Sequence, residues 1–456
     1  MIDSGDTTWI LISSALVMLM TPGLAFFYAG LVRSKNVIAT LMHCFVMLGL
    51  MSVVWVLWGY TLAFGPDQGG FIGGLDYFGL RNVGLEPGPY ADTIPHQLYM
   101  IFQLMFAVIT PALIIGAFAE RAKFSTLLVF SVIWVTVVYA PMAHWVWGDG
   151  GWLQDLWGEP ALDFAGGTVV HVNAGMAAIA AAIIFGRRTG FGREPMEPHN
   201  VTMVILGTAL LWFGWFGFNA GSALAAADTE SNTSLAVNAF VVTHVAAAAA
   251  ALTWLFLTWY FQKKPSAVGA ATGAVAGLVA ITPAAGFIGE WPGTDGYLNS
   301  MPAILIGVGA GVVTYLAVRA RILLKLDDSL DVWGVHGMGG AWGALATGIF
   351  AVAAVGGTAG LIDGEPGQLA RQLVGIGAAA GYSLVLPLII LKGLDLTMGL
   401  RVTEDEERLG LDVSEHGERG YVFDEAGIPA VPPATLPVER PAPAPTPAKQ
   451  EPAESG

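Results

Sequence analysis

Charged side chains are scarce in this sequence. Of its 456 residues, 12% are Asp, Glu, Lys or Arg and 55% are hydrophobic, whereas soluble domains contain about 25% charged residues. No basic cluster lies away from the edges of the apolar runs, which argues against nucleic-acid binding. The composition therefore predicts an integral membrane protein.

Cysteine is nearly absent as well. The single residue, Cys44, lies within an apolar run, so no disulfide forms within the chain and a small core residue is the simplest interpretation. The N-terminus, Met-Ile-Asp-Ser-Gly-Asp, lacks the positively charged segment that opens a signal peptide. We therefore expect the first apolar run to be retained as a membrane span.

Eleven apolar runs are long enough to cross a bilayer, which needs about 18 or more residues. They are rich in Gly and Ala, as in 269–277, and small residues let membrane helices pack closely. The sequence predicts an all-α membrane protein of eleven transmembrane helices, with spans at 8–32, 37–64, 98–118, 124–147, 164–186, 200–222, 234–261, 266–287, 300–318, 332–355 and 371–394.

The loops between these spans alternate in positive charge. One set of loops contains twelve Lys and Arg residues, and the other contains two, Arg81 and Arg371. Because cytoplasmic loops carry the excess of positive charge, we predict an N-terminus outside and, after an odd number of spans, a C-terminus in the cytoplasm. Spans one to five and six to ten then form an inverted 5+5 repeat, a common transporter plan, followed by a final helix.

Two histidines occupy corresponding places, in the last span of each half. His171 lies in the fifth span and His336 in the tenth. An ionisable side chain within a span is costly and indicates a functional site, so the pair predicts a conduction path. Asp163 and Asp331 precede the two histidines, and each either attracts cations or caps the start of its helix.

Five runs in the spans carry a resemblance to a known family: Thr-Pro-Gly-Leu-Ala-Phe-Phe-Tyr-Ala-Gly-Leu-Val-Arg (21–33), Ile-Thr-Pro-Ala-Leu-Ile-Ile-Gly-Ala-Phe-Ala-Glu-Arg (109–121), Asp-Phe-Ala-Gly-Gly-Thr-Val-Val-His (163–171), Trp-Phe-Gly-Trp-Phe-Gly-Phe-Asn-Ala-Gly-Ser (212–222) and Asp-Val-Trp-Gly-Val-His-Gly (331–337). With 399–402 and 410–417 in the tail, they resemble the ammonium transporter (Amt/Mep/Rh) family, of the bacterial Amt type. The resemblance covers residues 8–425, and the loop at 148–162 departs from it by its length.

The resemblance implies that ammonium binds in an outer vestibule between Trp147, Phe106 and Ser222. A cation over a Trp ring gains ~0.5–2 kcal/mol, which suits loose selection and quick release. An interfacial aromatic belt is the structural alternative. Beneath the vestibule, Phe106 and Phe218 are expected to form a gate against water and hydrated ions, with ordinary helix packing as the alternative.

The resemblance also implies that His171 and His336 share a hydrogen bond along the pore, near the pore-lining Trp215. In a dry pore the neutral imidazole is favoured, and a neutral pair can pass a proton and bind ammonia. Deprotonating ammonium at pH 7 costs roughly 3–5 kcal/mol, whereas burying a bare cation costs on the order of 20 kcal/mol before compensation. We therefore expect ammonium to be deprotonated and conducted as ammonia with a relayed proton, while Asp163 and Asp331 support the path.

Three regions are expected: an eleven-span ammonium transporter domain (1–398), a charged cytoplasmic regulatory segment (399–426) and a disordered Pro- and Ala-rich tail (427–456). The resemblance implies a homotrimer in the inner (plasma) membrane and allows a PII-type signalling protein to bind the cytoplasmic face. It implies no cofactor and no metal. Two alternatives stay open, a membrane ammonium sensor that signals through the tail and a neutral-gas channel of the Rh type.

Overall fold

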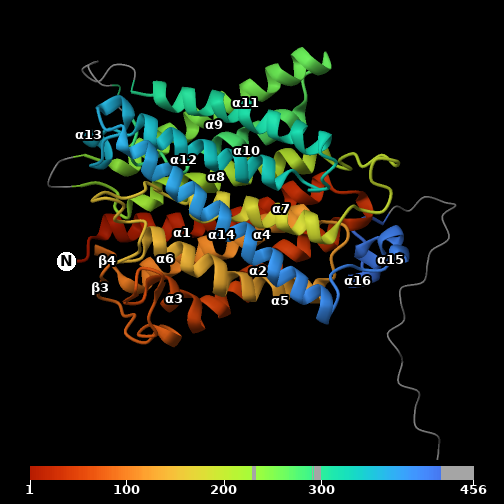
Figure 1. Cartoon of the computed structure of the whole chain (residues 1–456), viewed down its shortest axis with the longest axis horizontal. Coiled ribbons are helices and arrows are strands. Elements are labelled where there is room, and N and C mark those ends of the chain that lie inside the picture. Colours follow the sequence, from red (N-terminus) through yellow and green to blue (C-terminus); the bar gives the residue numbers. More distant parts are fainter. Residues whose placement is uncertain (229–232, 290, 292–298, 423–456) are drawn as a thin grey trace, which may run out of the picture. The chain divides into compact units, whose positions relative to one another are not determined.

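Long apolar helices make up most of the chain (Figure 1). The computed structural model describes residues 1–228, 233–289, 291 and 299–422. Among these residues, nine helices are long and apolar enough to cross a membrane: Ser4–Leu31, Ser34–Phe64, His96–Phe118, Phe124–Trp147, Gly167–Phe185, Val201–Ala223, Leu235–Gln262, Met301–Leu323 and Gly367–Thr397. The predicted helical, multi-pass membrane class is confirmed.

Several spans are built from more than one helical segment. The simple ones are α1 (Ser4–Leu31), α4 (His96–Phe118), α8 (Val201–Ala220), α9 (Leu235–Gln262), α11 (Met301–Leu323) and α14 (Gly367–Thr397). The others contain a π-helical turn: α2 (Val37–Val54), Trp55–Gly59 and α3 (Tyr60–Phe64); α5 (Phe124–Trp134), Val135–Tyr139 and α6 (Ala140–Trp147); and Gly167–Val172 with α7 (Asn173–Phe185). Such turns widen the helix and occur often at functional sites.

The two remaining predicted spans are shorter as helices than as apolar runs. α10 (Ala267–Ile281) has 15 residues and ends just before Pro283, which cannot donate a backbone hydrogen bond. A π-helical turn (Trp333–Gly337) followed by α12 (Met338–Phe350) ends where Ala351 becomes extended. The predicted count of eleven membrane-crossing helices and their orientation therefore stay a prediction.

Close helix packing rests on small residues, as predicted for 269–277. A Cβ at Gly273 would lie 2.6 Å from the Cβ of Trp254, and one at Gly277 would lie 2.5 Å from the carbonyl of Ala246, so both glycines let α10 meet α9. Elsewhere α1 packs along α8, and α14 packs on α7 and α12 (Figure 1).

Among the described residues, two short hairpins lie in the chain between α3 and α4. β1 (Asp67–Gln68) pairs with β2 (Ile72–Gly73), and β3 (Pro87–Gly88) pairs with β4 (Ala91–Pro95), both antiparallel. The first hairpin follows α3 directly and contacts α6 through β2. It therefore lies beside the end of the span that carries Trp147.

The segment after α14 folds back onto the loop between α1 and α2. It contains α15 (Glu404–Leu409) and α16 (Leu411–His416). Lys35 donates to the carbonyl of Glu407 at 2.8 Å, and Asp412 accepts from the backbone N–H of Ala39 at 2.8 Å. Residues 1–420 form one compact unit, whereas the predicted tail at 427–456 lies outside the described residues.

Candidate functional site

The two predicted histidines meet in the interior of the bundle. Their Nδ1 atoms are 3.3 Å apart, and their ring centroids are 5.3 Å apart at an interplanar angle of 25°. Both are buried, with His171 1% and His336 4% exposed. Two ring nitrogens at this distance share one hydrogen, so one ring donates and the other accepts. Nε2 of His171 is buried without a hydrogen-bond partner among the described residues.

Both histidines lie in π-helical turns at the start of a helix. His171 belongs to Gly167–Val172 and His336 to Trp333–Gly337. Each turn follows a non-helical loop. The first backbone N–H groups of the turn therefore have no helical partners and point toward that loop. An acidic side chain in that loop can satisfy them.

Asp163 fills this role for the first turn. One carboxylate oxygen accepts from the N–H groups of Gly166 (2.8 Å) and Gly167 (2.6 Å). The other accepts from the N–H groups of Thr168 (2.7 Å) and Val169 (3.2 Å) and from the Thr168 hydroxyl. Because both oxygens are committed to the helix start, the geometry favours the structural and electrostatic role over direct contact with a cation.

The corresponding cap of the second turn is Asp328, which the sequence analysis missed. Its carboxylate is fully buried and accepts from the N–H of Trp333 at 2.8 Å. Asp328 precedes His336 by eight residues, as Asp163 precedes His171. This equal spacing is the signal in the sequence from which Asp328 could have been predicted as the cap.

Asp331, which we expected to be the counterpart of Asp163, lies elsewhere. Its carboxylate is 2.6 Å from Nε of Arg321, and its own backbone has a left-handed φ of 61°. It gives no side-chain cap to the turn at Trp333–Gly337. Its predicted capping role is therefore replaced by an ion pair, while cation attraction by Asp331 stays a prediction.

Aromatic rings continue the path on the other side of the histidines. Phe106 and Phe218 are in contact, with centroids 4.4 Å apart, and Trp147 lies 6.0 Å from Phe106. Phe218 is in turn 6.0 Å from His171. Trp215 stacks on His171 at 5.5 Å. The structure thus brings together four of the predicted aromatic residues and the histidine pair.

Among the described residues, the side chains of Trp147 and Ser222 each make one hydrogen bond. Trp147 donates from Nε1 to the carbonyl of Asp163 at 2.9 Å, and the Ser222 hydroxyl donates to the carbonyl of Phe218 at 2.9 Å. Both side chains are partly exposed. A hydroxyl that donates to its own helix keeps its lone pairs available as acceptors.

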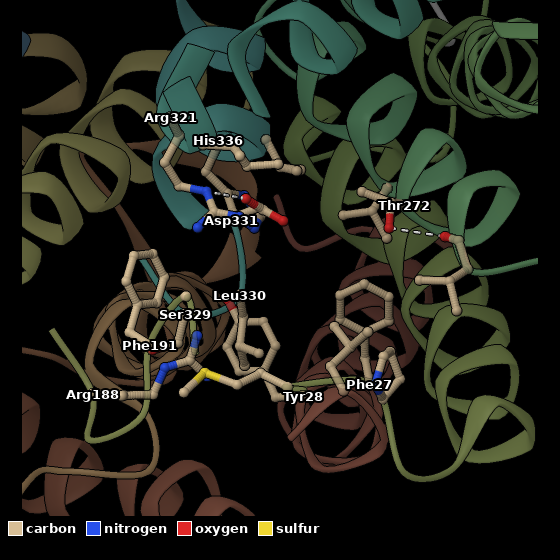
Figure 2. Close-up of a pocket in the computed structure, with 18 of the residues that line it drawn as sticks. Phe27, Tyr28, Arg188, Phe191, Thr272, Arg321, Ser329, Leu330, Asp331 and His336 are labelled. Atoms are coloured by element: carbon tan, nitrogen blue, oxygen red, sulfur yellow. Dashed lines mark hydrogen bonds and ion pairs between the residues drawn. The ribbon is translucent and has the colours of Figure 1, made fainter. Parts of the chain in front are cut away.

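Two cavities flank the histidines. A narrow one of about 10 Å³, room for about one water-sized probe, is lined by His171, Trp215, Phe218 and His336 among largely apolar side chains. A wider one of about 430 Å³ reaches His336 from the other side (Figure 2). Figure 2 shows His336, Asp331 and Arg321 on one wall of it, facing Phe27 and Tyr28. The path is therefore narrow and apolar at the histidines and opens beyond His336.

A buried ionic network meets the wide cavity at Arg188. Glu120 accepts from Arg33 (2.9 Å), Asn36 (2.8 Å) and Arg188 (2.7 Å), and Arg188 also binds Asp327. Burial raises the pKa of Glu120, but the guanidinium groups of Arg188 and Arg33 outweigh it and hold the pKa at about 2. The network joins the loops after α1, α4, α7 and α11.

No group of three or more His, Cys, Asp or Glu side chains suited to a metal ion occurs in the part of the chain that the structure describes.

Known proteins resemble the chain over most of its length. Residues 8–421 match the model of the Ammonium Transporter Family. An ammonium transporter of Bacillus subtilis is 47% identical over 420 residues, covering 91% of this chain and 98% of its own. Ammonium transporter Amt1 of Archaeoglobus fulgidus is 47% identical over 417 residues, covering 91% and 99%. The crystal structure of Candida albicans Mep2 matches with a TM-score of 0.80 at 37% identity, covering 89% of this chain and 88% of its own.

Proposed function

Because the chain belongs to the ammonium transporter family, we propose that it moves ammonium across the membrane as ammonia plus a relayed proton. The observation that carries this proposal is the contact between His171 and His336, 3.3 Å apart in a narrow apolar cavity that opens beyond His336. Such a pair can accept a proton at one end and release it at the other.

The first step is recruitment of ammonium in an outer vestibule. Trp147 and Phe106 supply aromatic faces, and Ser222 supplies a hydroxyl oxygen that can accept from ammonium. The rings are 6.0 Å apart, and the Trp147 indole is anchored by its bond to Asp163. This supports loose, reversible binding of a small cation.

The second step is deprotonation, since the cavity beyond is too apolar for a cation. Removing the proton at pH 7 costs roughly 3–5 kcal/mol, far less than the order of 20 kcal/mol for a bare ion in a low-dielectric medium. Phe106 and Phe218, in contact at 4.4 Å, form the gate that ammonia passes after a ring movement. Nε2 of His171, which has no hydrogen-bond partner among the described residues, accepts the proton that ammonium gives up. Nδ1 of His171 passes its own proton to Nδ1 of His336, and Nε2 of His336 releases one toward the wide cavity, while ammonia crosses separately.

The remaining expectations about architecture belong to the same proposal. Nine spans together with α10 and the Trp333–Phe350 helix make eleven, arranged as an inverted 5+5 repeat plus a final helix with its N-terminus outside. Exposed apolar side chains along α9 and α11 support contact with lipid or with the other subunits of a homotrimer. The inner membrane is the proposed location, and the docked segment from residue 399 onward is the proposed regulatory and PII-binding region.

Reconstituted vesicles test the proposal. After an ammonium jump, wild type should carry an inward current with ammonia flux, and potassium should carry none. We expect His171→Ala with His336→Ala to abolish the selective ammonium current, whereas His244→Ala, on the exposed side of α9, should leave it intact. An undiminished and still selective current in the double variant would refute the relay.

The same measurement separates two other functions. A Rh-type neutral-gas channel would show ammonia flux without current. A sensor would bind ammonium with little flux of either kind; this alternative has support from a solved structure titled "Sensor Amt Protein", which matches with a TM-score of 0.81 at 30% identity.

A further inference from the structure

A histidine one turn before Trp147 stands outside the conduction path. His144 lies in the last turn of α6, and its side chain is fully buried. Nδ1 is 2.8 Å from the carbonyl of Ala63, and Nε2 is 2.9 Å from a carboxylate oxygen of Asp67. This contact could not be predicted from the sequence, because His144 and Asp67 are 77 residues apart.

Both partners of this imidazole are acceptors. A carbonyl oxygen only accepts, so Nδ1 carries a hydrogen. A carboxyl with the ordinary Asp pKa of about 3.9 is already ionised at neutral pH, so Asp67 also only accepts. Nε2 must therefore carry a hydrogen too, and a ring with two N–H groups is an imidazolium.

The surroundings favour a positive charge at this place. Ala63 belongs to the last turn of α3 and His144 to the last turn of α6, and helix C-termini attract cations. Asp67 on β1 is the carboxylate in contact with the ring. The Tyr90 hydroxyl accepts from the N–H of Asp149, just after α6, at 3.2 Å and donates to the carbonyl of Phe64 at 2.9 Å.

The contact ties three elements together at the rim of the outer vestibule. Asp67 holds the hairpin through the N–H of Gly70 at 2.7 Å. At Gly148 a Cβ would collide with Nδ1 of His144, so the chain leaves α6 directly against the imidazole. Trp147 stands between His144 and this glycine, and its orientation depends on the same last turn.

We propose that His144 is an imidazolium that donates to the Ala63 carbonyl and to the Asp67 carboxylate. These two hydrogen bonds position Trp147 in the outer ammonium site. The proposal rests on the proposed function for the role of Trp147. The protonation state of His144 does not depend on that role and can be measured separately.

The first experiment is solid-state NMR of the full chain in bilayers with ¹⁵N-labelled histidine at pH 7. We expect one ring with two protonated nitrogens in wild type, and its loss in His144→Gln. Asp67→Asn should reduce the ring to one N–H, because the amide can donate to Nε2. Asp76→Asn, which removes the same charge from the same outer loop, is the matched control and should leave both hydrogens. A single N–H on His144 in wild type would overturn the imidazolium.

The second experiment measures KM and Vmax for ammonium uptake in the same variants. His144→Gln should raise KM about two- to thirtyfold, the range that a cation–π contact contributes, with Vmax within about twofold. Asp67→Asn should raise KM at pH 7 by a similar factor, whereas Asp76→Asn should leave KM unchanged.

Unchanged KM in both His144→Gln and Asp67→Asn would overturn the positioning role. Trp147→Leu distinguishes this failure from failure of the proposed function. If that variant also keeps its KM, the proposed outer site for ammonium is wrong. The NMR experiment still tests the protonation state of His144 independently of that site.

Discussion

Replacing Glu120 by Gln should destabilise the protein and remove part of its sensitivity to acid. The Glu120 carboxylate is fully buried and bound by two guanidinium groups, of Arg33 and Arg188. Its pKa is held at about 2, against an ordinary value of 4.5. This difference corresponds to about 3 kcal/mol of stability at neutral pH, similar to the ~3–5 kcal/mol lost when a buried ion pair is broken.

The sign of the pH dependence follows from the lowered pKa. The carboxylate contributes fully above pH 4.5, and its contribution is lost as the pH falls through about 2. Gln cannot titrate, so the difference in unfolding free energy between wild type and Glu120→Gln should shrink from about 3 kcal/mol at pH 7 to about 1 kcal/mol at pH 3.

Denaturant unfolding of the two proteins in detergent, at both pH values, measures this difference. Glu404→Gln is the matched control, because it removes the same charge from an exposed pair with Arg408 and should change stability little at either pH. A difference that stays constant between pH 7 and pH 3, or a control that behaves like Glu120→Gln, would refute the reasoning.

Three further changes test the conduction path. Asp163→Asn turns an acceptor toward the N–H of Gly166 into an N–H donor, so we expect little folded protein in size-exclusion chromatography, whereas Asp331→Asn should fold normally. Phe218→Ala opens the gate, and methylammonium uptake should become faster while potassium current appears; unchanged selectivity would contradict the gate. Ser222→Ala removes one hydrogen bond from a charged donor, worth about 1.5–3 kcal/mol, and should raise KM for ammonium about ten- to a hundredfold without lowering Vmax; a fall in Vmax alone would instead assign Ser222 to a later step.

The sequence predicted the parts of the fold that depend on local composition. Apolar runs marked the spans, and the small residues of 269–277 marked a seam between helices that the structure contains. Two helices end earlier than the apolar runs that predicted them, α10 at Ile281 and α12 at Phe350. Hydropathy does not reveal that α10 ends before Pro283 or that the backbone becomes extended at Ala351.

Contacts between distant loops could not be predicted. Glu120 occurs within a recognisable motif. Its carboxylate, however, binds Arg33, Asn36 and Arg188, which belong to two other loops and come close to it only in the folded chain. Asp331 lies next to the predicted start of the tenth span, so the sequence favoured it as the counterpart of Asp163. Only the folded chain shows that Asp331 turns to Arg321 instead.

The corrected pairing of Asp163 with Asp328 strengthens the case for two inverted halves. In each half a buried carboxylate caps a helix start, and a histidine follows it by eight residues in a π-helical turn. The carboxylate offsets the positive end of each helix, so burial among apolar side chains is what disfavours a positive charge at each histidine. In the proposed mechanism, ammonium therefore passes the histidines only after it gives up a proton. The repeated local structure therefore argues for ammonia, rather than ammonium, as the species that crosses the narrow cavity.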